Sequence, residues 1–269
     1  MMNWKQLISA KRFGMEEFHE ERQENRSEFQ RDYDRLIFSA PFRRLQNKTQ
    51  VFPLPGSVFV HNRLTHSLEV ASVGRSLGDD VAKALLERHP ELQDSFLPEI
   101  GSIVSAACLA HDLGNPPFGH SGEKAISTFF SEGKGVRLKE KQPNGEQLSP
   151  MEWEDLTHFE GNANAFRILT HQFEGRRKGG FVLTYTTLAS IVKYPFSSSL
   201  ARTKSKFGFF VSEEESFQKI ATELGLTLLN EHPLKYARHP LVYLVEAADD
   251  ICYQMMDIED AYKLKILTT

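Results

Sequence analysis

The residues best suited to metal chemistry are His111 and Asp112, which close an otherwise apolar stretch, Ile100–Leu113. A Gly-Asn-Pro-Pro sequence at 114–117 then stops any helix. Burying an imidazole beside a carboxylate in such surroundings is costly unless something compensates. A divalent cation does so, because its ligands are neutral imidazole and ionised carboxylate. The alternative is an ordinary His-Asp pair at a helix C-terminus, where the helix dipole stabilises a cationic histidine. The dipeptide taken alone favours this alternative.

Two further sites favour a cation. His66 lies on or beside the Leu64/Leu68 face of an amphipathic segment, and Asp249 and Asp250 lie within an apolar one, 241–256. Successive helical residues are about 100° apart, so at most one of the two aspartates can point at a shared centre. Three helices would thus supply imidazole and carboxylate ligands, which suit Mn, Fe, Zn or Mg and leave positions open for water and phosphate.

His120 and Glu123 stand three residues apart after the two prolines. If a helix begins near Ser121, Glu123 can orient the imidazole for proton transfer. The alternative is a cap, with Ser121 as the capping residue and Glu123 in the first turn. Arg63, one turn before His66, suits bidentate phosphate contact, although a solvated surface charge is the usual state of a single arginine.

Other polar residues could line the same pocket. Lys193 and Tyr194 precede a proline and could contact phosphate, but a lysine at a helix C-terminus is an equally good interpretation. Tyr253 and Asp257 follow Asp249 at four-residue intervals and so share one helical face. Their alternative is a core tyrosine and a surface aspartate.

The elements that must position these residues are mainly helices. Apolar periodicity predicts helices at about 61–88, 100–113, 121–130, 161–173, 187–193, 213–226 and 240–256. In the first of these, Leu64, Leu68, Val73, Leu77, Val81 and Leu85 form the apolar face. Strand signals are few, at about 48–59 and 206–211. Residues 1–35 predict a charged N-terminal helix or arm, and 131–152 a loop or lid. We expect residues 1–269 to form one mainly α domain with a minor β-ribbon.

The 269 residues carry a net charge of −4, so the positive charge for a polyanionic substrate must gather locally. Cys108 and Cys252 lie in apolar stretches, as buried thiols of a reducing compartment do, and no signal or membrane-spanning run is present. We therefore expect a cytoplasmic protein without a membrane partner. Most of the 20 Phe residues fit core positions, although Arg43-Arg44 and Lys204/Lys206 could serve single-stranded DNA or an effector nucleotide.

Four strings resemble the deoxyguanosinetriphosphate triphosphohydrolase family of the HD superfamily, and they occur in the family's order. They are FRRLQNKTQVFPL (42–54), NRLTHSLEV (62–70), HDLGNPPFGHSGE (111–123) and EAADDICY (246–253). The resemblance implies an HD-type helical bundle with the metal site between its helices. The metal ligands would be His66, His111, Asp112 and Asp249, with Asp250 a neighbour.

The resemblance also implies roles for the other residues. His120 and Glu123 would be the catalytic pair, and Arg63 would contact the triphosphate, with Lys193 and Tyr194 in a similar segment. Tyr253 would pack on the deoxyribose and leave no room for a 2'-hydroxyl, while Asp257 and Gln50 would lie near the 3'-hydroxyl.

The implied reaction is attack of a metal-associated water or hydroxide on the α-phosphorus of a dNTP, which yields deoxynucleoside and inorganic triphosphate. The cofactor would be one divalent ion, Mn or Mg first, with Fe, Zn, Ni or Co as alternatives, and the partners a dNTP and further copies of the chain. Alternative functions are another HD phosphohydrolase, either a nucleotidase or a phosphodiesterase, and a non-catalytic module for nucleotide sensing or DNA binding. Family members generally carry a further C-terminal region, so we expect 1–269 to be a short form or a piece of a longer protein.

Overall fold

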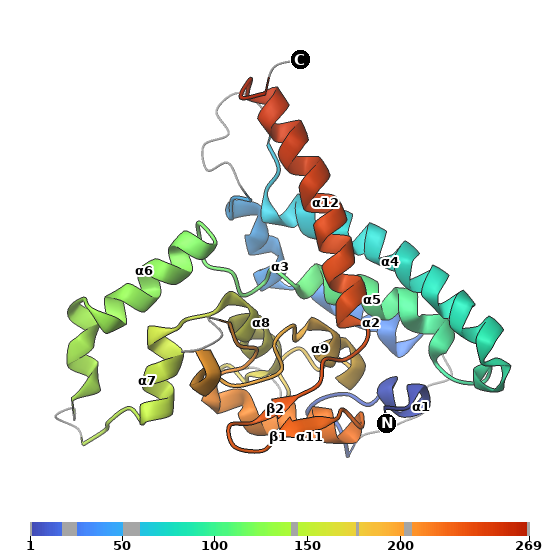
Figure 1. The fold of residues 1–269 in the computed structure, drawn as a ribbon, viewed down its shortest axis with the longest axis horizontal. Helices are drawn as coiled ribbons and strands as arrows, with labels where there is room; N and C mark the ends of the chain where they lie inside the picture. The colour runs from blue at the N-terminus through green and yellow to red at the C-terminus, as the bar shows by residue number, and fades with distance from the viewer. Residues whose placement is uncertain are drawn as a thin grey trace.

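The computed structural model describes residues 2–17, 26–50, 60–140, 145–175, 178–201 and 206–267. Helices dominate this part of the chain, as the sequence predicted (Figure 1). The α-helices are α1 Trp4–Leu7, α2 Glu28–Ile37, α3 Ala40–Arg44, α4 Arg63–Arg88, α5 Ile100–Ala110, α6 His120–Ser131, α7 Pro150–Thr157, α8 Gly161–Thr170, α9 Tyr185–Ile191, α11 Glu214–Glu223 and α12 Val242–Lys263. The 3₁₀ helices are η1 Leu45–Asn47, η2 Pro90–Leu92, η3 Leu97–Glu99, η4 Lys134–Lys139, η5 Ser198–Leu200 and η6 Val211–Glu213.

Helix α5 forms the centre of the core. It is apolar around its whole circumference, and all eleven of its residues are buried, because a helix without a polar face is stable only when surrounded. Helix α4 lies along it, and α2, α9 and α12 pack against it from other sides (Figure 1). The end of α5 is therefore held by several elements at once.

The predicted apolar face of α4 is confirmed in part, because Leu64, Val73, Leu77 and Leu85 pack against the core, but the fully buried face is a different one. Its buried residues are mostly small or polar: Arg63, His66, Ser67, Val70, Ala71, Gly74, Gly78 and Ala82. Leu68, which the sequence placed on the apolar face, is 42% exposed. Small residues let two helix backbones approach closely: a Cβ on Gly78 would lie 2.7 Å from the Cα of Gly101 in α5. His66 is consequently on the face that meets α5.

The predicted N-terminal arm packs on the body rather than extending as one helix. In its described part it contains α1 and the start of α2, and the backbone of residues 11–13 bonds to residues 183–185. The Arg12 guanidinium lies on the fully buried carboxylate of Asp32, at 2.7 Å. Charge in this segment thus serves a tertiary contact.

The strands of the described residues do not lie where strands were predicted. The two-stranded antiparallel sheet joins β1 (Leu228–Asn230) to β2 (Lys235–Tyr236), where no strand was expected. The predicted ribbons are reduced to isolated bridges, Thr49 with Asn62 and Ser197 with Phe209, and residues 51–59 lie outside the described part. Pairing between distant segments decides such short strands, and local sequence does not reveal it.

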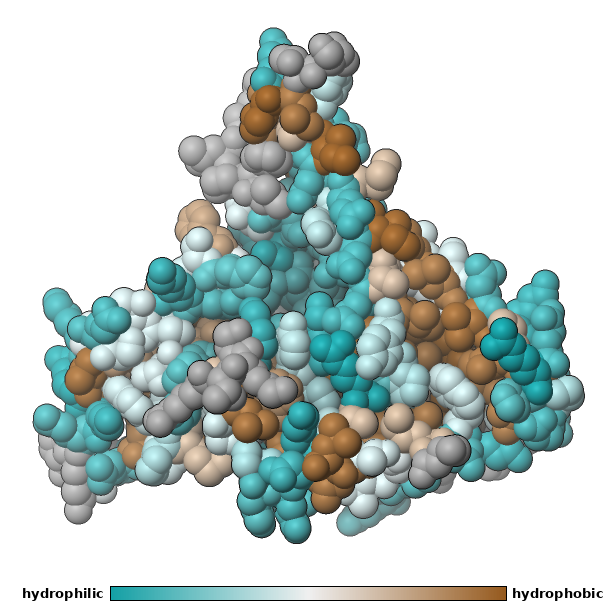
Figure 2. Space-filling view, in the orientation of Figure 1, coloured by the Kyte–Doolittle hydropathy of each residue, from teal (hydrophilic) through white to brown (hydrophobic). Residues whose placement is uncertain are grey.

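Two other segments contain more helix than the sequence predicted. The expected loop at 131–152 contains η4 and the start of α7, while 141–144 lie outside the described residues. Helix α12 continues seven residues past the predicted 256 and rises from the body toward the C-terminus (Figure 1). Hydrophobic side chains are exposed along this projection (Figure 2). None of the described helices is long and apolar enough to cross a membrane.

Candidate metal centre

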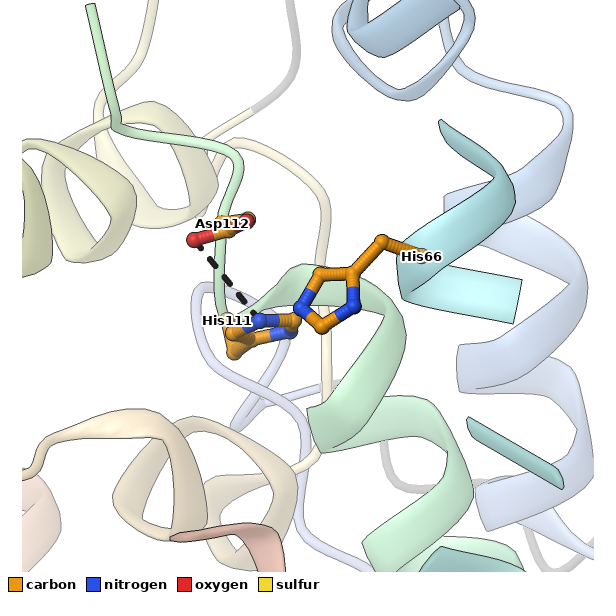
Figure 3. Close-up of side chains that lie close together, drawn as sticks. All are labelled: His66, His111 and Asp112. Carbon is orange, nitrogen blue, oxygen red and sulfur yellow. Dashed lines mark ion pairs between the residues drawn. The ribbon is translucent and has the colours of Figure 1, made fainter. Parts of the chain in front are cut away.

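Two histidines from adjacent helices meet at the centre of the molecule. His66 lies in the first turn of α4, which Asn62 begins by accepting hydrogen bonds from the backbone amides of Leu64 and Thr65. His111 directly follows the last residue of α5. The two rings point toward each other with centroids 5.3 Å apart (Figure 3). Both imidazoles are buried or nearly so, with His66 only 1% exposed.

Two carboxylates adjoin the imidazoles. Ligand atoms of His66, His111 and Asp112 all lie within 4.8 Å of one another, as Figure 3 illustrates. Asp249 of α12 is outside this group of three, yet its Oδ1 lies 2.9 Å from Nε2 of His66 and 3.6 Å from Nε2 of His111. The neighbouring Asp250 is exposed. Only one of the two aspartates faces the centre, as helical geometry required.

The donor set fits a divalent cation. His111 donates from Nδ1 to the carbonyl of Cys108 at 2.6 Å, which leaves Nε2 to face the two carboxylates. That Nε2 is buried without a hydrogen-bond partner among the described residues. A buried polar atom without a partner is costly, and two imidazoles with two carboxylates are ligands that borderline divalent metals accept. His66, His111, Asp112 and Asp249 could therefore hold one ion.

The same charges shift the pKa values of the cluster. Burial by itself would lower the pKa of His111, but Asp112 and Asp249 outweigh it and raise that pKa to about 9. Burial would raise the pKa of Asp249, yet the adjacent imidazoles of His111 and His66 bring it well below its usual range. The cluster thus favours a positive charge between its carboxylates.

The turn after Asp112 is fixed by close packing. A Cβ on Gly114 would lie 2.0 Å from the carbonyl oxygen of Gly161, so α8 can approach only a glycine here. The Asn115 amide donates to Asp112 Oδ1, and the Arg63 guanidinium donates to Oδ2. Both oxygens of the carboxylate are thereby oriented.

His120 and Glu123 form a hydrogen-bonded pair beside this turn. Helix α6 begins at His120 after Gly119, so the alternative with Ser121 as the capping residue is wrong. His120 Nδ1 and Glu123 Oε2 are 2.7 Å apart, and Glu123 Oε1 accepts from the Gly161 amide at 2.8 Å. Glu123 is buried, while the His120 side chain is 84% exposed. A fixed carboxylate thus orients an accessible imidazole.

Three cationic side chains line the pocket next to the histidines. Arg63 is buried at 8% exposure, so a solvated surface charge is the wrong interpretation for it. Lys193 pairs with Glu246 at 3.1 Å, and Lys206 pairs with Glu160 at 3.0 Å. Each of these cations is paired with a carboxylate, and the pocket wall also carries Asp249 and Asp257.

The pocket has a volume of about 480 Å³. The structure brings eleven of the twelve sequence-predicted site residues to its wall: Gln50, Arg63, His66, His111, Asp112, His120, Lys193, Tyr194, Asp249, Tyr253 and Asp257. The twelfth, Glu123, is bonded to His120. Oε1 of Gln50 is buried without a partner among the described residues. The roles of these residues remain predictions.

Several other wall residues had no role predicted from the sequence. Asn115 and Glu246 were noted only as members of the strings that resemble the family, with Asn115 also part of a helix stop, and Asn162 was not singled out. Lys206 was considered for an accessory contact but lies in the pocket, whereas Lys204 is outside the described residues. Their contacts depend on segments far apart in sequence, which spacing cannot reveal.

Comparison with known proteins agrees with this geometry. The family model described as HD domain matches residues 63–179, a range that contains His66, His111 and Asp112. A deoxyguanosinetriphosphate triphosphohydrolase-like protein of Synechocystis is 46% identical, over 99% of this chain and 61% of its own length. A protein of that same name from Pseudomonas aeruginosa is also 46% identical, over 99% of this chain and 58% of its own.

A deoxyguanosinetriphosphate triphosphohydrolase of Yersinia enterocolitica is 36% identical, over 99% of this chain and 56% of its own length. The chain therefore spans about 60% of the length of the curated relatives it matches.

Proposed function

Since this chain carries an HD domain and belongs to the deoxyguanosinetriphosphate triphosphohydrolase family, we propose that it hydrolyses deoxynucleoside triphosphates to deoxynucleoside and inorganic triphosphate. One observation carries the proposal: two imidazoles, two carboxylates, an oriented histidine and three cations share one pocket. Phosphoryl transfer depends chiefly on positioning and charge stabilisation, which such a set of residues can supply.

His66, His111, Asp112 and Asp249 would hold the divalent ion, because their side chains converge and His111 Nε2 has no other described partner. Such an ion would polarise the phosphoryl oxygens and lower the pKa of a bound water. Mn or Mg is the first choice, since carboxylate ligands suit both.

The cations would neutralise the triphosphate. Arg63 presents a rigid fork for bidentate contact, and Lys193 a point charge. Each is held by a carboxylate, Asp112 for the arginine and Glu246 for the lysine. Those carboxylates pre-orient the cations, so substrate phosphates would meet charges already in position.

His120 would transfer a proton. Water attacks the α-phosphorus, the bond from phosphorus to the 5'-oxygen breaks, and that oxygen takes up a proton as the deoxynucleoside leaves. Glu123 fixes the imidazole through its 2.7 Å contact, so His120 can serve at the attacking or the leaving oxygen. Gln50, Tyr253 and Asp257, which line the same pocket, would contact the deoxyribose.

Product analysis tests the function directly. The chain is incubated with Mn or Mg and each of the four dNTPs or GTP, and the products are separated by chromatography. We expect inorganic triphosphate and deoxynucleoside from at least one dNTP, and much less product from GTP. Release of phosphate or pyrophosphate would favour another HD phosphohydrolase. Absence of any product with every substrate would favour a non-catalytic nucleotide-binding module.

A further inference from the structure

Lys48 contacts both segments that hold the histidines, the start of α4 and the turn after α5. It directly follows η1, two residues before Gln50. Its ammonium donates to the carbonyl oxygens of Asn115 at 2.6 Å and Leu113 at 3.2 Å. Both carbonyls belong to the turn that leaves His111 and Asp112.

The carbonyls of this turn need partners from elsewhere. In a continuing helix, the Leu113 carbonyl would accept from the amide of residue 116 or 117, but both are prolines and have no N–H. Asn164 donates to the neighbouring Gly114 carbonyl at 2.8 Å. Side chains from outside thus hold the turn, and Lys48 alone supplies two of these bonds among the described residues.

The backbone of Lys48 makes the connection to the other helix. Its carbonyl accepts from the Arg63 amide at 3.0 Å, and the next residue, Thr49, forms a bridge with Asn62. Arg63 is the first residue of α4, three before His66. One residue therefore bonds to the start of α4 through its backbone and to the end of α5 through its side chain.

Burial of the Lys48 ammonium costs free energy, because a charged group loses its hydration there. Burial lowers the pKa of Lys48, and the nearby Arg63 lowers it further, with Asp112 acting in the opposite direction. A neutral amide, like that of Asn164, caps a carbonyl without this cost. The lysine has the reach to bond two carbonyls across the gap between the helices.

We propose that Lys48 is a positioning residue of the metal centre, which keeps the turn bearing Asp112 and Asn115 in register with His66. Asn115 transmits the effect, because its amide bonds Asp112 and its own carbonyl accepts from Lys48. The inference rests on the proposed function only in that the four-residue cluster binds a metal ion.

The test compares Mn²⁺ affinity in Lys48→Met, Lys48→Arg and Lys83→Met. Methionine keeps the length of the side chain but donates no hydrogen bond, arginine keeps donors and charge, and Lys83 is an exposed residue of α4. Binding is measured by calorimetric titration well below each melting temperature. Loss of a residue that orients a ligand typically weakens metal binding about 10–100-fold, which we expect for Lys48→Met. Lys48→Arg should bind Mn²⁺ more tightly than Lys48→Met, because it keeps the donors and the charge, and Lys83→Met should bind like the wild type.

A folded Lys48→Met protein with wild-type Mn²⁺ affinity would overturn the inference while leaving the proposed function intact. If the wild type itself bound no Mn²⁺, the proposed metal site would fail instead. Should Lys48→Met not fold, Lys48→Ala, which donates no hydrogen bond and leaves room for water at the two carbonyls, is titrated in its place. Wild-type affinity in that variant would count equally against Lys48.

Discussion

At the scale of single residues, the proposed metal ligands and the proposed proton donor differ in their surroundings. His111 is buried against two carboxylates, whereas His120 is exposed and touches only Glu123 among the contacts described for it. Removal of His111 should therefore affect metal binding, whereas removal of His120 should affect turnover.

The first prediction concerns these two histidines. His111→Ala should lose both the metal ion and the activity, since it removes a ligand from the group of three. His120→Ala should keep the metal and lose about 10²–10⁴-fold in kcat, the usual contribution of a positioned acid or base. Metal content by mass spectrometry and steady-state kinetics check both variants. Full turnover by a metal-loaded His120→Ala protein would remove the proton-transfer role.

The second prediction is that metal binding depends on pH. The pKa of His111 is raised to about 9 by Asp112 and Asp249 against the effect of burial, while a metal ligand must be neutral imidazole. Below that pKa, binding must displace a proton, so the association constant should rise about tenfold per pH unit between about pH 6 and 8. Titrations in buffers of different ionisation enthalpy measure the proton released. A pH-independent constant would show that the imidazole is already neutral.

At the scale of elements, the site is assembled by contacts between segments rather than within them. α4 and α5 supply the imidazoles, and α12 supplies Asp249 after packing on both. The geometry of the histidine and aspartate cluster therefore depends on how closely α4 and α5 approach and on how α12 is anchored.

The third prediction tests the α4–α5 approach. In Gly78→Ala, the added Cβ would lie 2.7 Å from the Cα of Gly101 and must push the helices apart. Overpacking of this kind costs about 1–3 kcal/mol, more than the gain in helix propensity. Urea denaturation should show this loss, while the exposed control Ser76→Ala should unfold like the wild type. A stabilised Gly78→Ala protein would mean that the helices separate freely.

The fourth prediction concerns His239, which ties the chain before α12 to the N-terminal segment. Its Nε2 donates to the Leu7 carbonyl at 3.0 Å, and its Nδ1 accepts from the Leu241 amide. Burial lowers the pKa of His239 to about 4, below the ordinary 6.5. The unfolded chain thus binds the proton first, so stability is complete above pH 6.5 and falls by about 3 kcal/mol as the pH drops toward 4.

Denaturation curves at pH 7 and pH 5 measure this dependence. In His239→Gln, one proton fewer should be taken up on unfolding in that range, so the slope of stability against pH should decrease accordingly. An unchanged slope would assign the acid sensitivity to other groups.

At the scale of the whole molecule, α12 projects from the body with an apolar stripe. Ile251, Met255, Ile258 and Tyr262 are 46%, 68%, 60% and 59% exposed, and their 4-3-4 spacing places them on one face. Such a stripe is typical of a helix that pairs with another.

The fifth prediction follows from that stripe. Self-association was expected from the family resemblance, and we expect the stripe to mediate it. Sedimentation velocity at several concentrations should show species larger than a monomer, and Ile258→Glu should shift them toward the monomer by burying a charge in the contact. A concentration-independent monomer of the wild-type chain would refute the prediction.

The sequence by itself determined the helical class and the chemistry-bearing residues, because apolar periodicity and helix stops are local properties. The apolar run of α5 followed by His111, Asp112 and two prolines specifies a buried helix end that carries an adjacent imidazole and carboxylate. Spacing also showed that only one of Asp249 and Asp250 could face inward. Single-domain organisation and cytoplasmic location remain inferences from the sequence alone.

Only the tertiary structure decided how these parts meet. The close face of α4 consists of small residues rather than its leucines, the strands lie at 228–236, and Lys48 and Asn115 support Asp112 from outside its helix. Such features depend on backbone approach and on hydrogen bonds between segments far apart in the chain. Local sequence does not specify these features, because the partner of a side chain depends on how the helices pack.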